Sequence, residues 1–104
     1  MFSDEARQNV QDAVLAELAN AVKNYGKTYN SFHEGYAVLL EEVEEAGDDM
    51  NYIRNNLSVL WQKIKDNELE DTALLTVISG TASMLALEAV QIAAVCEKFK
   101  KGLK

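Results

Sequence analysis

Two pairs of oxygen-bearing side chains lie among apolar residues, and each pair has the spacing of one helical turn. Glu42 and Glu45 stand three residues apart in the stretch HEGYAVLLEEVEEAGDDM. Glu88 and Gln91 have the same spacing in MLALEAVQIAAVC, where every other residue is apolar. Because residues three apart project from nearly the same face of a helix, each pair can present two side-chain oxygens to one neighbouring helix.

Of these four residues, Glu88 is the one whose burial would cost the most stability, because the apolar residues around it favour burial on every side of the helix. An ionised carboxylate that is buried without compensation costs several kcal/mol of stability. Two kinds of partner would compensate it: a lysine or arginine from another helix or subunit, or a cation that Glu88 shares with the carboxylates near Glu42. Carboxylate oxygens suit Mg²⁺, which usually retains several waters.

The helical phase of residues 41–49 separates their carboxylates into two groups. At about 100° per residue, the apolar side of this helix is centred near Val43 and Ala46. The carboxylates that point away from it, toward solvent, are Glu41, Glu44 and Asp48. Those along its flank are Glu42, Glu45 and Asp49. Glu42 lies closest to the predicted core, so Glu42 and Glu45 are the pair best placed to meet Glu88 on a neighbouring helix.

This arrangement resembles the MazG-like all-α nucleotide pyrophosphohydrolase superfamily. The pattern E-x-x-E at Glu42 and Glu45, followed by an acidic residue in an apolar run at Glu88, is similar in particular to its short, phage-type members. The resemblance is carried by SFHEGYAVLLEEVEEA and LEAVQIAAVCEKF, with Leu60-Trp61 between them, and covers roughly residues 25–100.

Two features depart from the pattern of that family. Gln91 stands where the second motif, E-x-x-D, has its aspartate, and it supplies an uncharged amide oxygen. The 43 residues from Glu45 to Glu88 exceed the usual interval between the two motifs. Both departures bear on turnover more than on the fold.

The resemblance implies a magnesium-dependent hydrolase. Glu42, Glu45 and Glu88 would be the metal ligands. The substrate would be a nucleoside triphosphate that is cleaved between its α- and β-phosphates into a monophosphate and pyrophosphate. A carboxylate would accept the proton of the attacking water, and Glu41 and Glu45 are the candidates for that base. Gln91 would contact the substrate.

Three further side chains are candidates for contacts with the substrate. Tyr36 and Trp61 are aromatic and can stack on a base, but both fall on or beside an apolar seam, and we favour core packing for both. Lys63 is a candidate for contacts with the phosphates, although lysines near helix ends more often serve solubility.

Capping and breaking signals divide the chain into three long helices that must position these residues. Ser3 is a typical N-cap, Gly26 a typical stop, and Ser31 with Glu34 forms an S-x-x-E capping box in which each side chain can satisfy the other's backbone N–H. The predicted helices cover residues 4–25, residues 31–66 and a third stretch that opens near residues 71–72. The lysines that complement the dipole at the C-terminal end of the third helix are Lys98, Lys100 and Lys101.

Apolar residues on the second and third helices recur alternately three and four residues apart, which is typical of helices that pack along their length. The predicted seam of the second helix is Phe32, Tyr36, Leu39, Val43, Ala46, Met50, Ile53, Leu57, Leu60 and Ile64. The predicted seam of the third is Leu74, Ile78, Thr81, Leu85, Glu88, Ile92, Val95 and Phe99. The first of these seams crosses Gly47 without a break, which favours one long helix there.

Composition indicates one all-α domain over residues 1–104, because the chain has no proline and its length allows one compact core. The net charge of −7 repels phosphate backbones and anionic membranes, so we expect no nucleic acid and no membrane as a direct partner. The longest uncharged stretch, residues 72–87, is shorter than the roughly 20 residues that span a bilayer. With one cysteine and no secretory signal, we expect a soluble, cytoplasmic protein.

The stretch MLALEAVQIAAVC has almost no polar side to turn toward water. We therefore expect a long-helix bundle, with about three helices per protomer, that assembles as a homodimer or homotetramer. Two alternatives to the hydrolase stay open. One is a catalytically weakened relative that binds nucleotide or metal, as Gln91 suggests, and the other is a non-enzymatic acidic helical interaction module.

Overall fold

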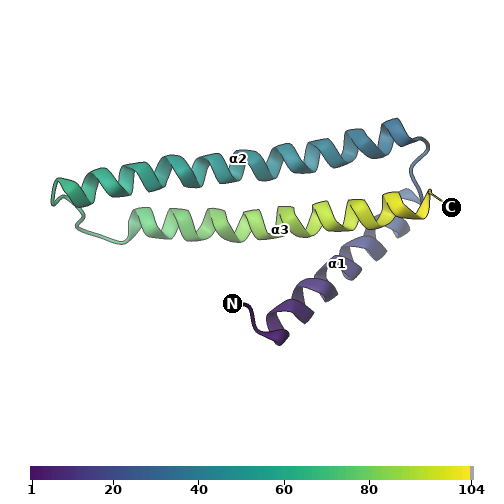
Figure 1. Ribbon diagram of the computed structural model, residues 1–104, viewed down its shortest axis with the longest axis horizontal. Coiled ribbons are helices and arrows are strands. Elements are labelled where there is room, and N and C mark those ends of the chain that lie inside the picture. Colours follow the sequence, from purple (N-terminus) through teal and green to yellow (C-terminus); the bar gives the residue numbers. More distant parts are fainter. Residues whose placement is uncertain (104) are drawn as a thin grey trace.

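Three long helices make up residues 1–103, the part of the chain that this computed structural model describes. They are α1 (Asp4–Tyr25), α2 (Phe32–Lys65) and α3 (Ala73–Lys101). The predicted all-α class and the three helices are confirmed. Figure 1 shows α2 and α3 side by side as a long antiparallel hairpin, with α1 crossing the C-terminal part of α3. The protomer is elongated, with extents of 58 × 32 × 22 Å.

The helix ends follow the capping signals. Ser3 and Ser31 each accept a hydrogen bond from the backbone N–H three residues on, at 3.1 Å in both cases. Glu34 completes the second cap, although its carboxylate accepts from the N–H of Asn30, at 3.2 Å, and not from Ser31 as predicted. α1 ends before Gly26, whose φ of 93° lies in the left-handed region that glycine adopts without strain.

α3 packs through the seam that the sequence predicts. All eight seam positions, from Leu74 to Phe99, are partly or fully buried. They include Glu88, which is partly buried and not fully enclosed. The periodicity of α3 therefore located its packing face, because one continuous partner, α2, lies along it (Figure 1).

α2 turns a different face to α3 from the one predicted. The seam residues that are partly buried are Leu39, Ala46, Ile53 and Leu60. At the other seam positions from Val43 onward, the predicted apolar residue is exposed and the residue just before it is partly buried. These partly buried residues are Glu42, Asp49, Asn56 and Lys63. The predicted seam is thus half wrong, because α2 carries two adjacent apolar rows and α3 covers only one of them. As a result, a polar row that contains Glu42 borders α3.

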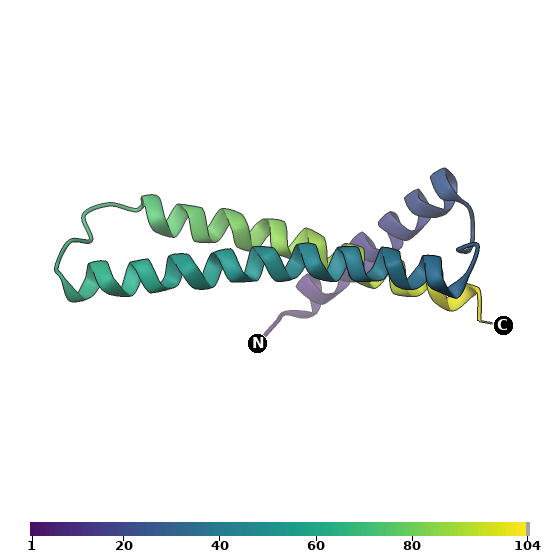
Figure 2. The same ribbon diagram turned by 90° about the horizontal axis from the view of Figure 1, so that it is seen from above.

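Apolar side chains along both helices of the hairpin remain uncovered in the protomer. On α2 they are Phe32, Tyr36, Leu40, Val43, Met50, Tyr52, Leu57, Val59, Trp61 and Ile64. On α3 they are Leu75, Val77, Met84 and Leu87. The expected burial of residues 84–96 on every side therefore holds for Ala94 and Val95 but not for Met84 and Leu87. The reason is that α1 covers only the C-terminal part of α3 (Figure 2).

By length and composition, α3 is the one helix within residues 1–103 that qualifies to cross a membrane. None of its most apolar 18-residue window is buried in the protomer. The helix continues well beyond the uncharged stretch of residues 72–87. The whole helix is therefore long enough to span a bilayer, although the uncharged stretch alone is not. An interior helix of a larger bundle has the same length and composition, so the absence of a membrane partner stays a prediction.

α1 packs on α3 and makes no packing contact with α2. The small core of the protomer lies on these helices, and its buried apolar residues are Val14 of α1 with Ala94 and Val95 of α3. Because α1 and α2 rest on a common support without touching one another, a cavity lined by residues of all three helices lies between them. The fold therefore places a hollow next to the polar row of α2.

Gly35 gives a test of how tightly α2 packs on the end of α3. A Cβ atom at Gly35 would lie 2.6 Å from Cε2 of Phe99, whose ring also packs near Tyr29 and Phe32. We expect Gly35→Ala to lower the free energy of unfolding by about 1–3 kcal/mol, because the added methyl group would force the ring of Phe99 to shift. Urea unfolding at a fixed protein concentration measures the change.

Gly47 is the matched control, because it lies in the same helix and a Cβ there meets nothing within 4 Å. Gly47→Ala should raise the free energy of unfolding by about 0.5–1 kcal/mol, since alanine loses less backbone entropy in a helix. Equal effects of the two substitutions would contradict the packing described for Gly35.

Candidate functional site

Three glutamates from two helices converge where α2 and α3 run side by side. One carboxylate oxygen from each of Glu42, Glu45 and Glu88 lies within 4.8 Å of the other two. Glu42 and Glu88 are partly buried and Glu45 is exposed. The structure thus brings together the three residues that the sequence singled out as a carboxylate cluster.

Helix packing explains why these side chains meet. Glu88 is a seam residue of α3, and the rotated face of α2 puts Glu42 on the line of contact between the two helices. Glu45 lies almost one turn further along α2, at the edge of that contact. All three stand inside continuous helices, so the rigid backbones fix their spacing.

The convergence of negative charge changes the acidity of the cluster. Burial, together with the charges of Glu45 and Glu41, raises the pKa of Glu42, although a hydrogen bond with Glu88 lowers it in part. The hydrogen bond with Glu88 and the charge of Glu88 raise the pKa of Glu45. Each added carboxylate makes the ionised form of its neighbours less favourable.

No basic side chain relieves this repulsion within the protomer. In residues 1–103 the only ion pair joins Lys100 and Glu97, which lie elsewhere on α3. The alternative in which Glu88 pairs with a lysine or arginine of the same chain is therefore not realised. Glu88 faces two other acids.

The donor set of the cluster fits a hard divalent cation. Three carboxylates offer oxygen ligands from two directions, and the exposed side at Glu45 leaves space for the waters that Mg²⁺ retains. Exposed acidic groups also converge in proteins that bind no ion, so the metal is a proposal that a binding experiment decides.

Gln91 makes a contact that the sequence did not reveal. Its Nε2 donates a hydrogen bond of 2.7 Å to Oε2 of Glu17 on α1. Because a carboxylate only accepts hydrogen bonds, this position needs a donor. An aspartate at position 91 would place a second carboxylate against Glu17. The contact with α1 thus gives a physical reason for the departure from the E-x-x-D pattern.

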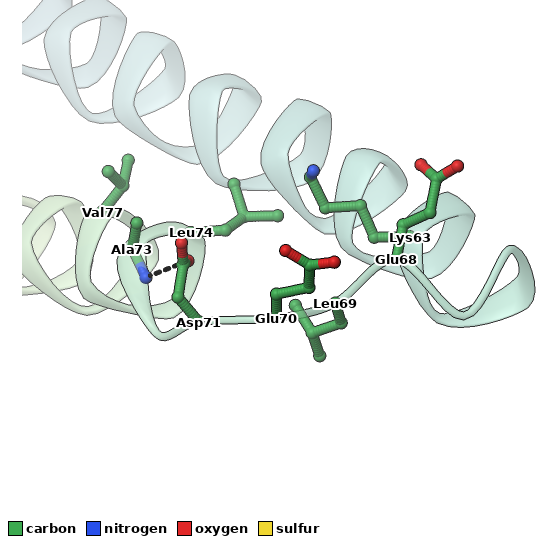
Figure 3. A pocket seen from close by; sticks show the side chains of 8 residues that line it. All are labelled: Lys63, Glu68, Leu69, Glu70, Asp71, Ala73, Leu74 and Val77. Atoms are coloured by element: carbon green, nitrogen blue, oxygen red, sulfur yellow. Dashed lines mark hydrogen bonds between the residues drawn. The ribbon is translucent and has the colours of Figure 1, made fainter.

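The structure does not bring Tyr36, Trp61 or Lys63 to the carboxylate cluster. At about 1.5 Å per residue, Trp61 and Lys63 lie roughly 24 and 27 Å along α2 from Glu45. Lys63 instead lines a pocket beside the loop that follows α2, with Glu68 and Glu70 (Figure 3).

The core packing favoured for the two aromatic residues is wrong for the protomer. Tyr36 is 62% exposed and Trp61 is 58% exposed. Both side chains belong to the face of α2 that α3 leaves uncovered or lie beside it. Nζ of Lys65 lies 5.7 Å from the ring centroid of Trp61.

The cavity between the three helices has a volume of about 430 Å³ and shares Glu42 with the carboxylate cluster. Its polar and aromatic lining consists of Tyr25, Tyr29, Glu34, Glu41, Glu42, Gln91 and Lys98. A volume of this size is in the range of small-molecule sites. Glu41 and Gln91, two residues predicted from the sequence, thus lie at the cavity, although Tyr25, Tyr29 and Lys98 were missed.

Lys98 is the most informative of the missed residues. A lysine near the end of a helix is expected to be exposed, yet Lys98 is 3% exposed and its Nζ lies 4.3 Å from the ring centroid of Tyr29. A signal was available, because Lys98 follows Gln91 by seven residues and so shares its helix face. Tyr29 lies in the loop between α1 and α2, where no periodicity could have marked it.

Comparison with known protein families, with curated proteins and with solved structures found no match to this chain. The resemblance to the MazG-like superfamily therefore stays a prediction that rests on the motifs around Glu42 and Glu88. The structure shows an all-α protein of three long packed helices.

The raised pKa values of Glu42 and Glu45 predict how stability depends on pH. A carboxyl group whose pKa is raised in the folded state binds its proton more tightly there, so its contribution favours folding at low pH. This contribution is lost as the pH rises from the unfolded-state value, near 4.5, through the folded-state pKa. Glu88→Gln removes the carboxyl group whose hydrogen bond and charge raise the pKa of Glu45, so we expect this variant to lose less stability over that window.

Melting temperatures between pH 4 and pH 7.5 at constant ionic strength measure the difference. Glu44→Gln is the control, because it removes one charge from an exposed residue next to the cluster but outside it. Profiles of Glu88→Gln and Glu44→Gln that run parallel would contradict the electrostatic role of Glu88.

Proposed function

We propose that this protein is a Mg²⁺-dependent nucleoside triphosphate pyrophosphohydrolase that cleaves between the α- and β-phosphates. The observation that carries the proposal is the convergence of Glu42, Glu45 and Glu88 beside a cavity large enough for a small polar ligand. The motifs that resemble the MazG-like superfamily supply the reaction type. The same three residues are those that the resemblance assigns to the metal.

Each step of this chemistry has a candidate residue in the chain. Glu42, Glu45 and Glu88 would hold Mg²⁺, which when bound neutralises phosphate charge and lowers the pKa of water. Glu41 lines the cavity beside Glu42 but does not belong to the converging three, so it is free to accept the proton of the attacking water. Glu45 is the second candidate for this base, since its raised pKa makes it a stronger proton acceptor.

A binding protein without turnover is the second candidate function, and the contact of Gln91 favours it. The amide of Gln91 is engaged with Glu17, so this position does not add a fourth negative ligand to the cluster. A cluster of three carboxylates can hold a cation and its nucleotide without turning the substrate over. An acidic helical interaction module is the remaining alternative, in which the uncovered apolar rows of α2 and α3 would be the functional surface.

A turnover screen tests the hydrolase directly. The protein is incubated with Mg²⁺ and a panel of canonical and noncanonical nucleoside triphosphates, and the release of pyrophosphate and monophosphate is measured. We expect Mg²⁺-dependent release of pyrophosphate from at least one member of the panel. Glu88→Gln should lower kcat/KM by about 100-fold or more, because it removes a metal ligand, whereas Glu44→Gln should leave it nearly unchanged. Absence of pyrophosphate, or release of single phosphate groups, would contradict the reaction.

Thermal unfolding provides the control that separates loss of metal from loss of fold. For a millimolar dissociation constant and about ten times that concentration of free Mg²⁺, binding adds roughly 1.4 kcal/mol of stability. In a domain of this size the melting temperature would rise by on the order of 5–10 °C, and Na⁺ at equal ionic strength should give a smaller rise. Glu88→Gln should lose the Mg²⁺-specific rise and stay at least as stable without metal. A wild type indifferent to Mg²⁺, beside a strongly destabilised Glu88→Gln variant, argues against the metal site.

We also propose that the protein is a soluble, cytoplasmic homodimer or homotetramer. Support comes from the uncovered row on α2, with Tyr36, Val43 and Leu57 among its members, which keeps heptad spacing with no helix against it. A second copy that packs on this row, and on the exposed Met84 and Leu87 of α3, would enclose both surfaces in a closed symmetric bundle.

Light scattering at micromolar concentration, without detergent, tests the assembly. We expect twice or four times the protomer mass of 11.6 kDa. Leu57→Glu and Val43→Glu, placed in the uncovered row, should shift the protein toward the monomer, because they bring charge into an apolar interface. A wild-type monomer, or a protein that dissolves only with detergent, would contradict this proposal.

A further inference from the structure

Lys98 is a buried cation without an anionic partner. Only 3% of the residue is exposed, and within residues 1–103 no carboxylate forms an ion pair with it. Its ammonium group instead lies 4.3 Å from the ring centroid of Tyr29. Lysines are rarely buried to this extent unless they are paired. Within residues 1–103 no side-chain nitrogen or oxygen is fully buried without a hydrogen-bond partner, so the ammonium group opens to the cavity that Lys98 lines. The burial of Lys98 therefore needs an explanation beyond packing.

The surroundings of Lys98 are those of a ligand site. Lys98 and Gln91 share one face of α3 and line the cavity between α1 and α2, and Glu42 lines the same cavity from α2. Glu42 also belongs to the carboxylate cluster. The cavity thus has an unpaired lysine in its lining and, through Glu42, adjoins a group of three converging acids. The two kinds of charge line one cavity without pairing with one another.

We propose that this cavity binds the phosphate groups of the nucleotide, with Nζ of Lys98 as a direct contact to the phosphate oxygens. This inference rests on the proposed function. A triphosphate that enters the cavity meets the carboxylates of Glu34, Glu41 and Glu42, all of which repel it. Lys98 is the only basic residue in the described lining that opposes this repulsion. It also forms charge-assisted hydrogen bonds that a monophosphate would use less fully.

Tyr29 holds the ammonium group of Lys98 ready for this contact. Burial and the charges of Glu34 and Glu42 raise the pKa of Tyr29, so its phenol stays neutral at physiological pH. The face of a neutral aromatic ring attracts a cation without neutralising it, in contrast to a carboxylate. Lys98 is therefore held in place while its charge remains available to a ligand. The edge of Phe99, whose ring centroid lies 6.0 Å from that of Tyr29, supports the ring in turn.

The test compares Lys98→Met with Lys101→Met in the full-length chain. Methionine keeps the unbranched chain of lysine up to its fourth heavy atom and removes the charged group. Lys101 is an exposed lysine on the last turn of the same helix. The probe is an α,β-methylene nucleoside triphosphate, which is not cleaved, and its affinity in the presence of Mg²⁺ is measured by calorimetry beside that of the matching monophosphate. We expect the wild type and Lys101→Met to prefer the triphosphate, and Lys98→Met to lose about tenfold or more of its affinity for the triphosphate and much less for the monophosphate.

The outcomes separate this inference from the proposed function. Lys98→Met should keep the rise in melting temperature with Mg²⁺, because the carboxylate cluster is intact. If the wild type binds the triphosphate and Lys98→Met keeps the same preference, the role of Lys98 is overturned while the hydrolase stands. If the wild type binds neither the analogue nor Mg²⁺, both proposals fall together.

A measurement on the wild-type protein covers the case in which Lys98→Met does not fold. The Cε resonances of ¹³C-labelled lysines are followed as the Mg²⁺ complex is titrated with the analogue. We expect the Lys98 signal to shift and the Lys101 signal to stay in place. A Lys98 signal that does not move when the analogue is saturating would overturn the proposed contact.

Discussion

Packing along α3 is the interaction on which the rest of the structure depends. α1 and α2 both rest on this helix and not on one another, so α3 places the residues of the carboxylate cluster and of the cavity relative to each other. One face carries Glu88 to the acids of α2. The neighbouring face carries Gln91 to Glu17 of α1 and Lys98 to Tyr29. The cavity exists because α1 and α2 both pack on α3 but do not contact each other.

The distribution of charge around that cavity works against stability. Three carboxylates converge there. Burial and the charges of Glu45 and Glu41 raise the pKa of Glu42, and the hydrogen bond with Glu88 and the charge of Glu88 raise the pKa of Glu45. Lys98 is buried nearby without an anion. A chain selected for stability alone would pair these charges or replace them with apolar side chains, since unpaired buried charge is costly. Sites that bind charged ligands tolerate such a cost, because the ligand supplies the missing partners.

The exposed apolar surface of the hairpin is the second feature that is unfavourable in the protomer alone. α2 has two apolar rows, and α3 can cover only one because a helix meets a neighbour along a single line of contact. The other row stays exposed, as do Leu75, Val77, Met84 and Leu87 of α3. Burial of these side chains would add stability in proportion to their area. The uncovered row thus gives the protomer a second surface with the heptad spacing of a helix–helix contact.

The sequence by itself determined the three helices, their ends and the packing seam of α3. These features follow from local rules, since capping residues and spacing act within one helix and need no knowledge of its neighbours. It also identified Glu42, Glu45 and Glu88, because acids in an apolar helix stand out from their surroundings.

Tertiary structure alone decided which of the two apolar rows of α2 faces α3. It also decided that Gln91 meets Glu17 and that Lys98 is buried beside Tyr29. Each of these depends on the rotation of one helix against another or on the path of a loop. A helical sequence repeats its pattern on several faces, and only the energy of packing against real neighbours selects among them.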